Sequence, residues 1–270
     1  MTKSMITTSK LTQRVNYHTH CDRCRHAKGK AEEYVEEAIR ANVSKLGFSD
    51  HMPFYDDRFG LRMPYGELDD YLEEVTALRD AYGDRISITR GFEGEYVRED
   101  NVYYEKLLSR GDCDYILLGQ HFYEKADGEL VNVYQLENTE GYEIYASNIV
   151  EGMRTGYFRY AAHPDLIFLN DFPWDIHCER ACDMIVDGAV RYGFPLEYNA
   201  NGFRRGKKAY ADGERFQYPH DRFWKKVQEA GVSVYVGSDC HEPGQVYDGI
   251  VEEAYGKLKE MGIAVRTDWI

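Results

Sequence analysis

The chain has 270 residues, 43% of them hydrophobic, and a formal net charge of −14. This length allows one large α/β domain or two small ones, with enough apolar side chains for a sizeable core. The acidic balance argues against a long nucleic-acid groove, which needs a basic surface, but it is compatible with a small anionic substrate if bound divalent cations offset the charge locally.

Residues 1–13 are polar and contain no apolar signal-peptide region, so we interpret them as a flexible N-terminal extension. No stretch approaches the ~20 apolar residues of a membrane span. Apolar segments then recur over residues 14–270 without a Pro/Gly/Ser-rich linker, which predicts a single catalytic domain. We expect a cytoplasmic protein whose six cysteines are free thiols, because disulfides are rare in that compartment.

Strands and helices alternate along the whole chain, the helices being recognised by apolar residues at helical spacing. In chain order, the predicted units are strand 14–17 with helix 30–41, strand 45–48 with helix 68–82, strand 86–92 with helix 101–109, strand 115–119 with helix 139–155, strand 157–162 with helix 178–192, strand 195–198 with helix 221–230, and strand 232–236 with helix 247–261. Residues 123–137 alternate like a hairpin insertion, and residues 263–265 are compatible with a last short strand. Seven such units predict a parallel sheet. Their number favours a closed (β/α)7 barrel, a relative of the eight-stranded TIM barrel.

Three histidines, His18, His20 and His26, lie within nine residues at the end of the first predicted strand. Alternate residues of an extended segment point the same way, so His18 and His20 would present two imidazoles to one point. That arrangement suits a divalent metal ion, and His26 could reach the same ion or a second one. A polar loop that happens to be rich in histidine is the alternative interpretation.

Every predicted strand except the sixth ends in residues that can bind a metal. These are His18, His20, His51, Glu93, His121, His163, Asp239 and His241. The C-terminal ends of parallel barrel strands open onto one face, so these side chains are expected to meet there. One such histidine could simply be a helix cap, but seven of the nine histidines at strand ends indicate a shared site.

Together with His26, these candidates are too many for one tetrahedral ion. Imidazoles with a few carboxylates suit zinc, iron or manganese, and two or three ions would leave positions open for water and substrate. Clustered metals serve hydrolysis at phosphorus well, because they activate a bound water and neutralise the phosphoryl oxygens. The sequence therefore favours a metal-dependent hydrolase.

Several motifs together resemble the polymerase and histidinol phosphatase (PHP) superfamily. They are Tyr17-His18-Thr19-His20 with His26, Ser49-Asp50-His51, Glu93, Gly119-Gln120-His121, Ala162-His163-Pro164-Asp165 and Ser238-Asp239-Cys240-His241, in this order over nearly the whole chain. The stretch Leu196-Glu197-Tyr198-Asn199 with Gly202-Phe203-Arg204-Arg205, and the chain's size, are most similar to the histidinol-phosphate phosphatase branch.

The resemblance implies a distorted (β/α)7 barrel that carries three divalent ions. It places one ion on His18, His20, Glu93 and Asp239. It places a second on Glu93, His121 and His163, with Glu93 bridging, and a third on His26, His51 and His241. The insertion at residues 123–137 is expected to reshape the mouth of this site.

The activity expected from the resemblance is hydrolysis of L-histidinol phosphate to L-histidinol and phosphate, a step of histidine biosynthesis. A hydroxide that bridges two ions would attack phosphorus in line, and Asp239 or His241 would assist the leaving alkoxide. Arg204 and Arg205 are candidates to bind the phosphate, because a guanidinium matches phosphate oxygens in a fork; a solvated basic loop is the alternative.

Glu197 and Asn199 could contact the amine of the substrate, although residues at a strand end can equally be structural. A PHP phosphoesterase for another small ester or a nucleotide is one rival, and a nuclease-type activity is a second. A non-catalytic metal or redox binding protein that uses Cys21 and Cys24 is a third. The expected partner is a small anionic phosphate ester, without nucleic acid or membrane.

Overall fold

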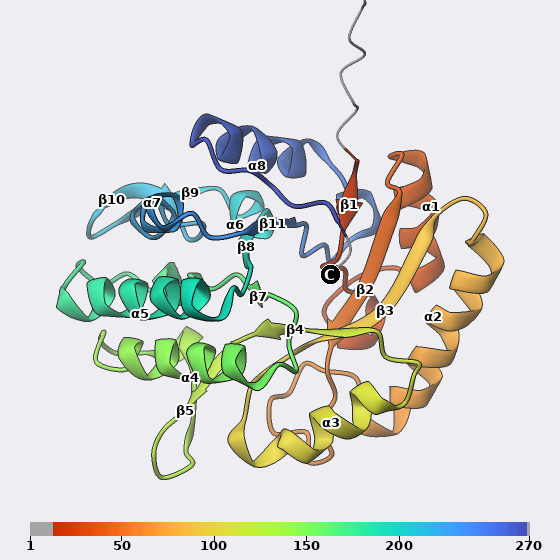
Figure 1. Ribbon diagram of the computed structural model, residues 1–270, viewed down its shortest axis with the longest axis horizontal. Helices are drawn as coiled ribbons and strands as arrows, with labels where there is room; N and C mark the ends of the chain where they lie inside the picture. The colour runs from red at the N-terminus through yellow and green to blue at the C-terminus, as the bar shows by residue number, and fades with distance from the viewer. Residues whose placement is uncertain (1–12, 269–270) are drawn as a thin grey trace, which may run out of the picture.

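Seven parallel strands form one curved sheet in the computed structural model, which describes residues 13–268 (Figure 1). In spatial order they are β1 (Val15–Asn16), β2 (Lys45–His51), β3 (Ser87–Gly94), β4 (Tyr115–Gly119), β7 (Ala161–Ala162), β8 (Leu196–Asn199) and β11 (Val234–Gly237). Beyond β1 and β11, Thr19 and Cys240 form a parallel bridge, and the His20 amide donates to the Cys240 carbonyl at 3.1 Å. The sheet is thus a nearly closed barrel, and the predicted α/β class is confirmed.

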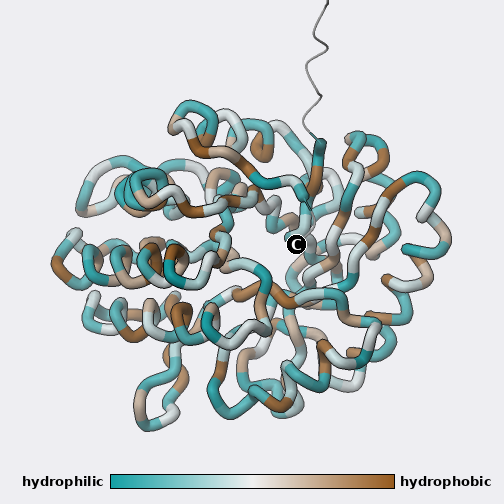
Figure 2. Tube along the Cα trace, viewed as in Figure 1, coloured by the Kyte–Doolittle hydropathy of each residue, from teal (hydrophilic) through white to brown (hydrophobic). Residues whose placement is uncertain are grey.

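Helices surround the strands on the outside of the barrel (Figure 1). They are α1 (Ala31–Arg40), α2 (Leu68–Tyr82), α3 (Asn101–Ser109), α4 (Tyr142–Thr155), α5 (Ile176–Tyr192), α7 (Asp221–Ala230) and α8 (Gly249–Glu260). Hydrophobic and hydrophilic residues alternate along each of them, as expected for helices with one face on a core (Figure 2). All seven predicted helices are present, with ends that differ by a few residues.

Two separate groups of buried side chains stabilise this architecture. The larger lies between the sheet and the helices. The smaller fills the barrel interior and consists of Val15, Tyr17, Tyr115, Leu117, Tyr160, Ala162 and Tyr235. Tyr115 donates hydrogen bonds to the carbonyls of Tyr17 and Phe48 there, at 2.8 and 3.0 Å. The barrel is therefore a packed core, which leaves the ends of its strands as the place for a site.

Two hairpins project from the barrel. The predicted insertion forms β5 (Phe122–Glu124) and β6 (Leu130–Asn132). The basic segment after β8, for which a solvated loop was the alternative interpretation, has regular structure. It forms the short helix α6 (Asn201–Arg204) and then a second hairpin, β9 (Lys207–Tyr210) with β10 (Gly213–Phe216). Its strands are largely exposed on both faces, so they show no alternation of apolar and polar residues that would predict them.

The predictions for the two ends of the chain have different outcomes. The predicted extension at residues 1–13 lies, apart from Gln13, outside the described residues. The last predicted strand is reduced to a single parallel bridge between Val234 and Val265. Within residues 13–268 no helix has the length and apolar character needed to cross a membrane.

Candidate metal centre

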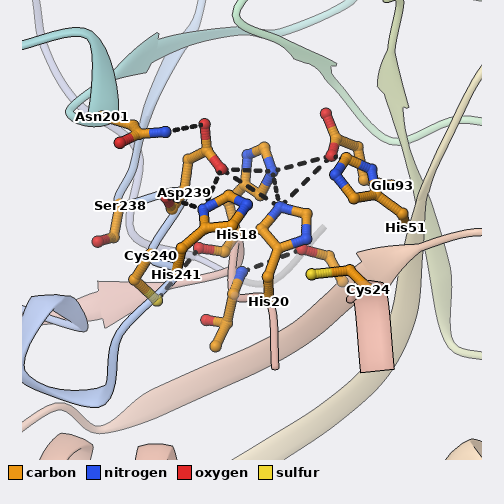
Figure 3. Close-up of polar contacts among 12 residues, drawn as sticks. His18, His20, Cys24, His51, Glu93, Asn201, Ser238, Asp239, Cys240 and His241 are labelled. Carbon is orange, nitrogen blue, oxygen red and sulfur yellow. Dashed lines mark hydrogen bonds and ion pairs between the residues drawn. The ribbon is translucent and has the colours of Figure 1, made fainter. Parts of the chain in front are cut away.

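The predicted metal ligands converge at the C-terminal ends of the strands. In Figure 3, the side chains of His18, His20, His51, Glu93, Asp239 and His241 surround a common centre. Strands β2 and β3 extend further than predicted, so His51 and Glu93 are strand residues, whereas the other four lie two to four residues beyond the ends of their strands. Fixed strands therefore set the positions of these groups, and the prediction that they meet in space is confirmed by the geometry.

Glu93 occupies the middle of the cluster and is 1% exposed. Its Oε1 lies 2.6 Å from Nε2 of His163 and 3.6 Å from Nε2 of His121. Its Oε2 lies 3.5 and 3.4 Å from Nε2 of His18 and His20, and 3.0 Å from Nδ1 of His51. Since the two oxygens face different histidines, this carboxylate has the geometry of a bridge between two ions.

A glycine makes room for this bridge. A Cβ atom at Gly119, on the neighbouring strand β4, would lie only 2.1 Å from Oε1 of Glu93. Gly237 on β11 plays the same part for Glu197, since its Cβ would be 2.2 Å from a carboxylate oxygen of that residue. Both carboxylates thus occupy space that any other residue would fill.

Two further sets of ligand atoms are compact. Nε2 of His18 and His20 are 3.1 Å apart, and Oδ1 of Asp239 is 3.2 Å from Nε2 of His20. His26, His51 and His241 bring one ligand atom each within 4.8 Å of one another, with 3.0 Å between Nε2 of His26 and His241. Such convergence of nitrogen lone pairs is what ligands of one ion require.

The other ring nitrogen of most of these histidines is fixed by a hydrogen-bond partner. Three of these partners are carboxylates: Nδ1 of His18 lies 2.9 Å from Glu197, Nδ1 of His20 lies 3.4 Å from Asp50, and Nδ1 of His121 lies 2.8 Å from Glu95. The other two are backbone carbonyls: Nδ1 of His26 lies 2.8 Å from the Cys24 carbonyl, and Nδ1 of His241 lies 3.1 Å from the Asp239 carbonyl. An Nδ1–H bonded in this way leaves the Nε2 lone pair for a metal and fixes the ring orientation. These supporting contacts are typical of metal sites.

Two residues predicted to contact substrate lie beneath the ligands instead. Glu197 and Asn199 are fully buried, and neither borders the cavity described below. Asn199 donates to Glu197 at 2.6 Å and to Oδ2 of Asp239 at 3.2 Å. Their burial on strand β8 places them as supports of His18 and Asp239, which is the structural role that the sequence left open for them.

Sequence reasoning also missed three supporting residues. Asp50 and Glu95 hold ligand histidines, and Arg62 donates to Glu95 at 2.7 Å. Glu95 additionally accepts the His121 amide at 2.7 Å. A signal existed for Glu95, because it follows Glu93 by two residues and alternate strand residues point the same way. Arg62 lies in a long loop and had no such signal.

The electrostatics of the cluster favour cations. Burial lowers the pKa of His20, but its contacts with Asp239 and Asp50 outweigh that effect and raise the pKa to about 9. Burial raises the pKa of Asp239, but the charges of His18 and its other histidine neighbours hold that pKa well below the usual range. Buried carboxylates therefore stay ionised among the imidazoles, as metal ligands must.

Unsatisfied polar atoms at the centre give an independent test of whether a metal fits. Nδ1 of His163 is buried without a hydrogen-bond partner among the described residues, and Oε2 of Glu93 and Nδ1 of His51 have no such partner there other than each other, at 3.0 Å. Buried polar atoms are normally fully paired, so these under-satisfied atoms in one cluster point to a bound cation. His163 and Asp239 also have positive φ angles, 30° and 47°, which are strained for non-glycine residues and concentrate at functional sites. The donor set fits divalent ions that prefer nitrogen and oxygen.

The two arginines predicted to bind phosphate have different surroundings. The Arg204 guanidinium bonds to Asp248 at 3.0 Å and to the Ser238 carbonyl at 2.5 Å, so its donors are engaged within the protein. The Arg205 guanidinium forms no hydrogen bond or ion pair within residues 13–268 and lies 5.7 Å over the Tyr218 ring. Arg205 is therefore the one of this pair that is available to a ligand.

A cavity of about 620 Å³ opens above the cluster. Its walls include ligand side chains at the floor, two arginines besides Arg204, and several aromatic rings. Among them are His26, His51, Glu93, His121, His163, Asp239, His241, Arg62, Arg205, Phe59, Phe122, Tyr134 and Tyr218. The volume suits a small organic ligand.

The cysteines are free and buried, as predicted for thiols without disulfide partners. Cys24 brings its sulfur within 4.8 Å of ligand atoms of His20 and His241. The Cys21 thiol donates to Asp50 at 3.0 Å. Both side chains are therefore part of the wall around the cluster.

Comparison with known proteins agrees with this geometry. The PHP domain matches residues 16–201, more than half of the chain. A probable histidinol-phosphatase of Deinococcus radiodurans is 29% identical over 238 residues, which are 85% of this chain and 86% of that protein. The histidinol-phosphatase of Bacillus subtilis is 25% identical over 275 residues, covering 90% of this chain and 98% of that protein.

Solved structures share the fold. Histidinol phosphate phosphatase from Lactococcus lactis, in complex with zinc, L-histidinol and phosphate, superposes with a TM-score of 0.70 at 16% identity, covering 94% of this chain and 95% of that one. A Listeria monocytogenes protein of the same kind gives a TM-score of 0.70 at 18% identity, covering 87% and 98%. The match to the domain and the ligand geometry agree, and the chain belongs to the PHP family.

Proposed function

We propose that this chain is a metal-dependent phosphomonoesterase that hydrolyses L-histidinol phosphate to L-histidinol and phosphate. The observation that carries the proposal is the convergence of nine ligand side chains, with Glu93 in their middle, at the floor of an open cavity. The substrate is inferred from the relatives, which are named histidinol-phosphatases.

Three divalent ions fit the available ligands. The first would bind to His18, His20, Glu93 and Asp239, and the second to Glu93, His121 and His163. The third would bind to His26, His51 and His241. The distances around Glu93 and the close approach of His26 to His241 support this division. Zinc, iron and manganese all suit imidazole and carboxylate ligands.

When bound, such ions would activate a water molecule for attack on phosphorus and offset the charge of the phosphoryl oxygens. The protein's part is to hold the ester in line above them. Arg205, whose guanidinium forms no hydrogen bond or ion pair within residues 13–268, can pair with a phosphate oxygen. Asp239 and His241 border the cavity and are our candidates for assisting the leaving alkoxide. Arg204 would act indirectly, by fixing the segment that carries both residues.

Three broader proposals accompany this activity. Residues 14–270 would form one catalytic domain, since strands from along the chain build a single sheet. The substrate would be a small phosphate ester and not nucleic acid, in keeping with the net charge of −14. We place the protein in the cytoplasm, where histidine biosynthesis occurs.

The decisive experiment measures phosphate release by the protein loaded with zinc, iron or manganese. L-histidinol phosphate would be compared with a panel of nucleotide and sugar phosphates. We expect a preference of ~100-fold or more in kcat/KM, on the order of 3 kcal/mol of transition-state discrimination. Slow and even turnover of all esters would contradict the assigned substrate but keep the phosphoesterase. No turnover with metals bound would favour a metal-binding protein.

A further inference from the structure

The inserted hairpin ends in a segment that is firmly attached to the barrel. After β6 the chain continues into a short 3-10 helix, Val133–Gln135. Val133 is fully buried, its amide donates to the His121 carbonyl at 2.9 Å, and its carbonyl accepts from Asn170 at 2.9 Å. The insertion is therefore anchored next to a metal ligand.

The next residue, Tyr134, extends from this anchor to the cavity. Its amide donates to the side chain of Asn132 at 2.9 Å, which fixes the turn. Its ring is 43% exposed, borders the cavity and is nearly parallel to the His121 imidazole, with 8° between the planes and 6.4 Å between the centroids. A ring that is this exposed does not fill the core. It instead forms part of the cavity wall above the ligands.

Other aromatic rings continue this surface along the rim. Phe59 and Phe122 also border the cavity, with their ring centroids 5.1 Å apart, and Tyr218 carries Arg205 on its face. The cavity thus has a polar floor of metal ligands and a rim rich in π surface. An ester whose phosphate lies on the floor must direct its leaving group toward that rim.

We propose that Tyr134 is a specificity-determining residue, which holds a planar ring on the leaving group of the ester. The inference rests on the proposed function, in which the leaving group carries an imidazole. A tyrosine ring binds such a group by offset stacking when it is neutral and by a cation–π contact when it is charged. The inserted hairpin then serves to select substrates, while the chemistry stays at the ends of the barrel strands.

The test compares Tyr134→Ala and Tyr134→Phe with the parent protein on three esters. L-histidinol phosphate and 4-nitrophenyl phosphate carry a ring, and O-phosphoethanolamine carries an amine without one. Tyr65→Ala is the matched control, because Tyr65 is 46% exposed but lies outside the cavity wall. Metal content would be measured for every variant.

We expect Tyr134→Ala to lower kcat/KM for L-histidinol phosphate by about 10- to 100-fold, mainly through KM, because a stacking contact is lost. Turnover of O-phosphoethanolamine should change by less than about threefold, and Tyr134→Phe should retain most activity, since the ring remains. Tyr65→Ala should match the parent protein, and metal content should be unchanged throughout.

Equal losses on all three esters, or a loss of metal, would overturn the proposal by showing a structural role. Unchanged kcat/KM for both ring-bearing esters would also overturn it. If the parent protein does not hydrolyse L-histidinol phosphate, the proposed function fails. The role of Tyr134 is then judged by the ratio of kcat/KM for 4-nitrophenyl phosphate to kcat/KM for O-phosphoethanolamine. If Tyr134 selects for a ring, Tyr134→Ala must still lower this ratio.

Discussion

The side chains at the floor of the cavity and those at its rim differ in how they are held by the protein. At the floor, Glu93 is 1% exposed and His18 is fully buried, and most of the ligand histidines are held by a second polar group. At the rim, Phe59 and Tyr218 are buried, but Tyr134 is 43% and Leu61 is 61% exposed, and these two are carried by segments that join the barrel elements. The difference indicates that strand geometry determines the chemistry, whereas residues on the connecting segments contribute to the choice of substrate.

The comparison predicts that damage at the floor is far more severe than at the rim. The largest effect should follow from Glu93→Gln, which removes the charge of the carboxylate that faces five histidines. We expect kcat to fall by ~1000-fold or more, together with loss of bound ions, because a shared ligand serves two of them. Activity assays and metal analysis would check this. Glu143→Gln is the control, since Glu143 pairs with His177 at the surface; retention of ions by Glu93→Gln would contradict the bridging role.

A methyl group should damage the floor almost as much. Gly119→Ala places a Cβ where Oε1 of Glu93 lies, so the bridging carboxylate must move. We expect a loss of ~100-fold in kcat/KM, in line with the cost of ~1 Å misplacement at a reacting centre. The control is Gly256→Ala in α8, where a Cβ meets nothing within 4 Å. Equal activity of the two variants would show that Glu93 adapts.

Support of the ligands should matter less than the ligands themselves. Glu197→Gln keeps an acceptor near Nδ1 of His18 but removes its charge. We expect zinc affinity to fall by about 10- to 100-fold, as is usual when such a partner is lost. Titration of zinc against a competing chelator measures it, again beside Glu143→Gln. An unchanged affinity would assign Glu197 to folding alone.

Arg204 and Arg205 are neighbours in sequence, but we expect one to support the fold and the other to bind the substrate. Arg205→Ala should lower kcat/KM by ~10-fold or more with little change in stability, because its guanidinium forms no hydrogen bond or ion pair within the described residues and only lies over the Tyr218 ring. Arg204→Ala should instead lower the free energy of unfolding by about 3 kcal/mol, because Asp248 is left without its charge partner. Kinetics and urea unfolding of both variants give the comparison. The reverse pattern would exchange their roles.

The floor could be predicted from sequence because parallel strands bring their C-terminal ends together whatever lies between them. His18, His51 and His241 could therefore be grouped although more than 200 residues separate the first from the last. The alternation of strands and helices could also be predicted from the sequence, since the spacing of apolar residues reflects which face of an element is buried.

The supports and the rim could not be predicted in the same way. Glu197 was assigned to the substrate because a strand-end carboxylate does not reveal whether it is buried, and burial depends on the absence of a side chain at Gly237. Arg204 and Arg205 are adjacent and chemically identical, and only the fold separates them. The hairpin of β9 and β10 has no apolar face, so no periodicity marked it.

His220 is a buried histidine away from the floor, and its expected effect, on the pH dependence of stability, is the smallest of those predicted. His220 caps α7 by accepting the Arg222 amide and lies 3.2 Å from Asp212. Burial and the charge of Arg215 lower its pKa to about 4, although Asp212 acts in the opposite direction. The unfolded chain, with a histidine pKa of about 6.5, then takes up the proton first as the pH falls. Stability from this group is therefore complete above about pH 6.5 and is lost between there and about pH 4.

Replacement of His220 by asparagine preserves a capping side chain but removes this titration. Metal-free parent protein should lose on the order of 1–3 kcal/mol more unfolding free energy than His220→Asn between pH 7 and pH 4.5. Metal-free samples are needed because protonation of the ligand histidines would otherwise release ions over the same range. Denaturant unfolding at both pH values measures the difference, and parallel pH profiles would mean that folding does not lower the pKa of His220. Asp212 would then offset the effects of burial and of Arg215, as the carboxylates of the floor outweigh the effect of burial on the pKa of His20.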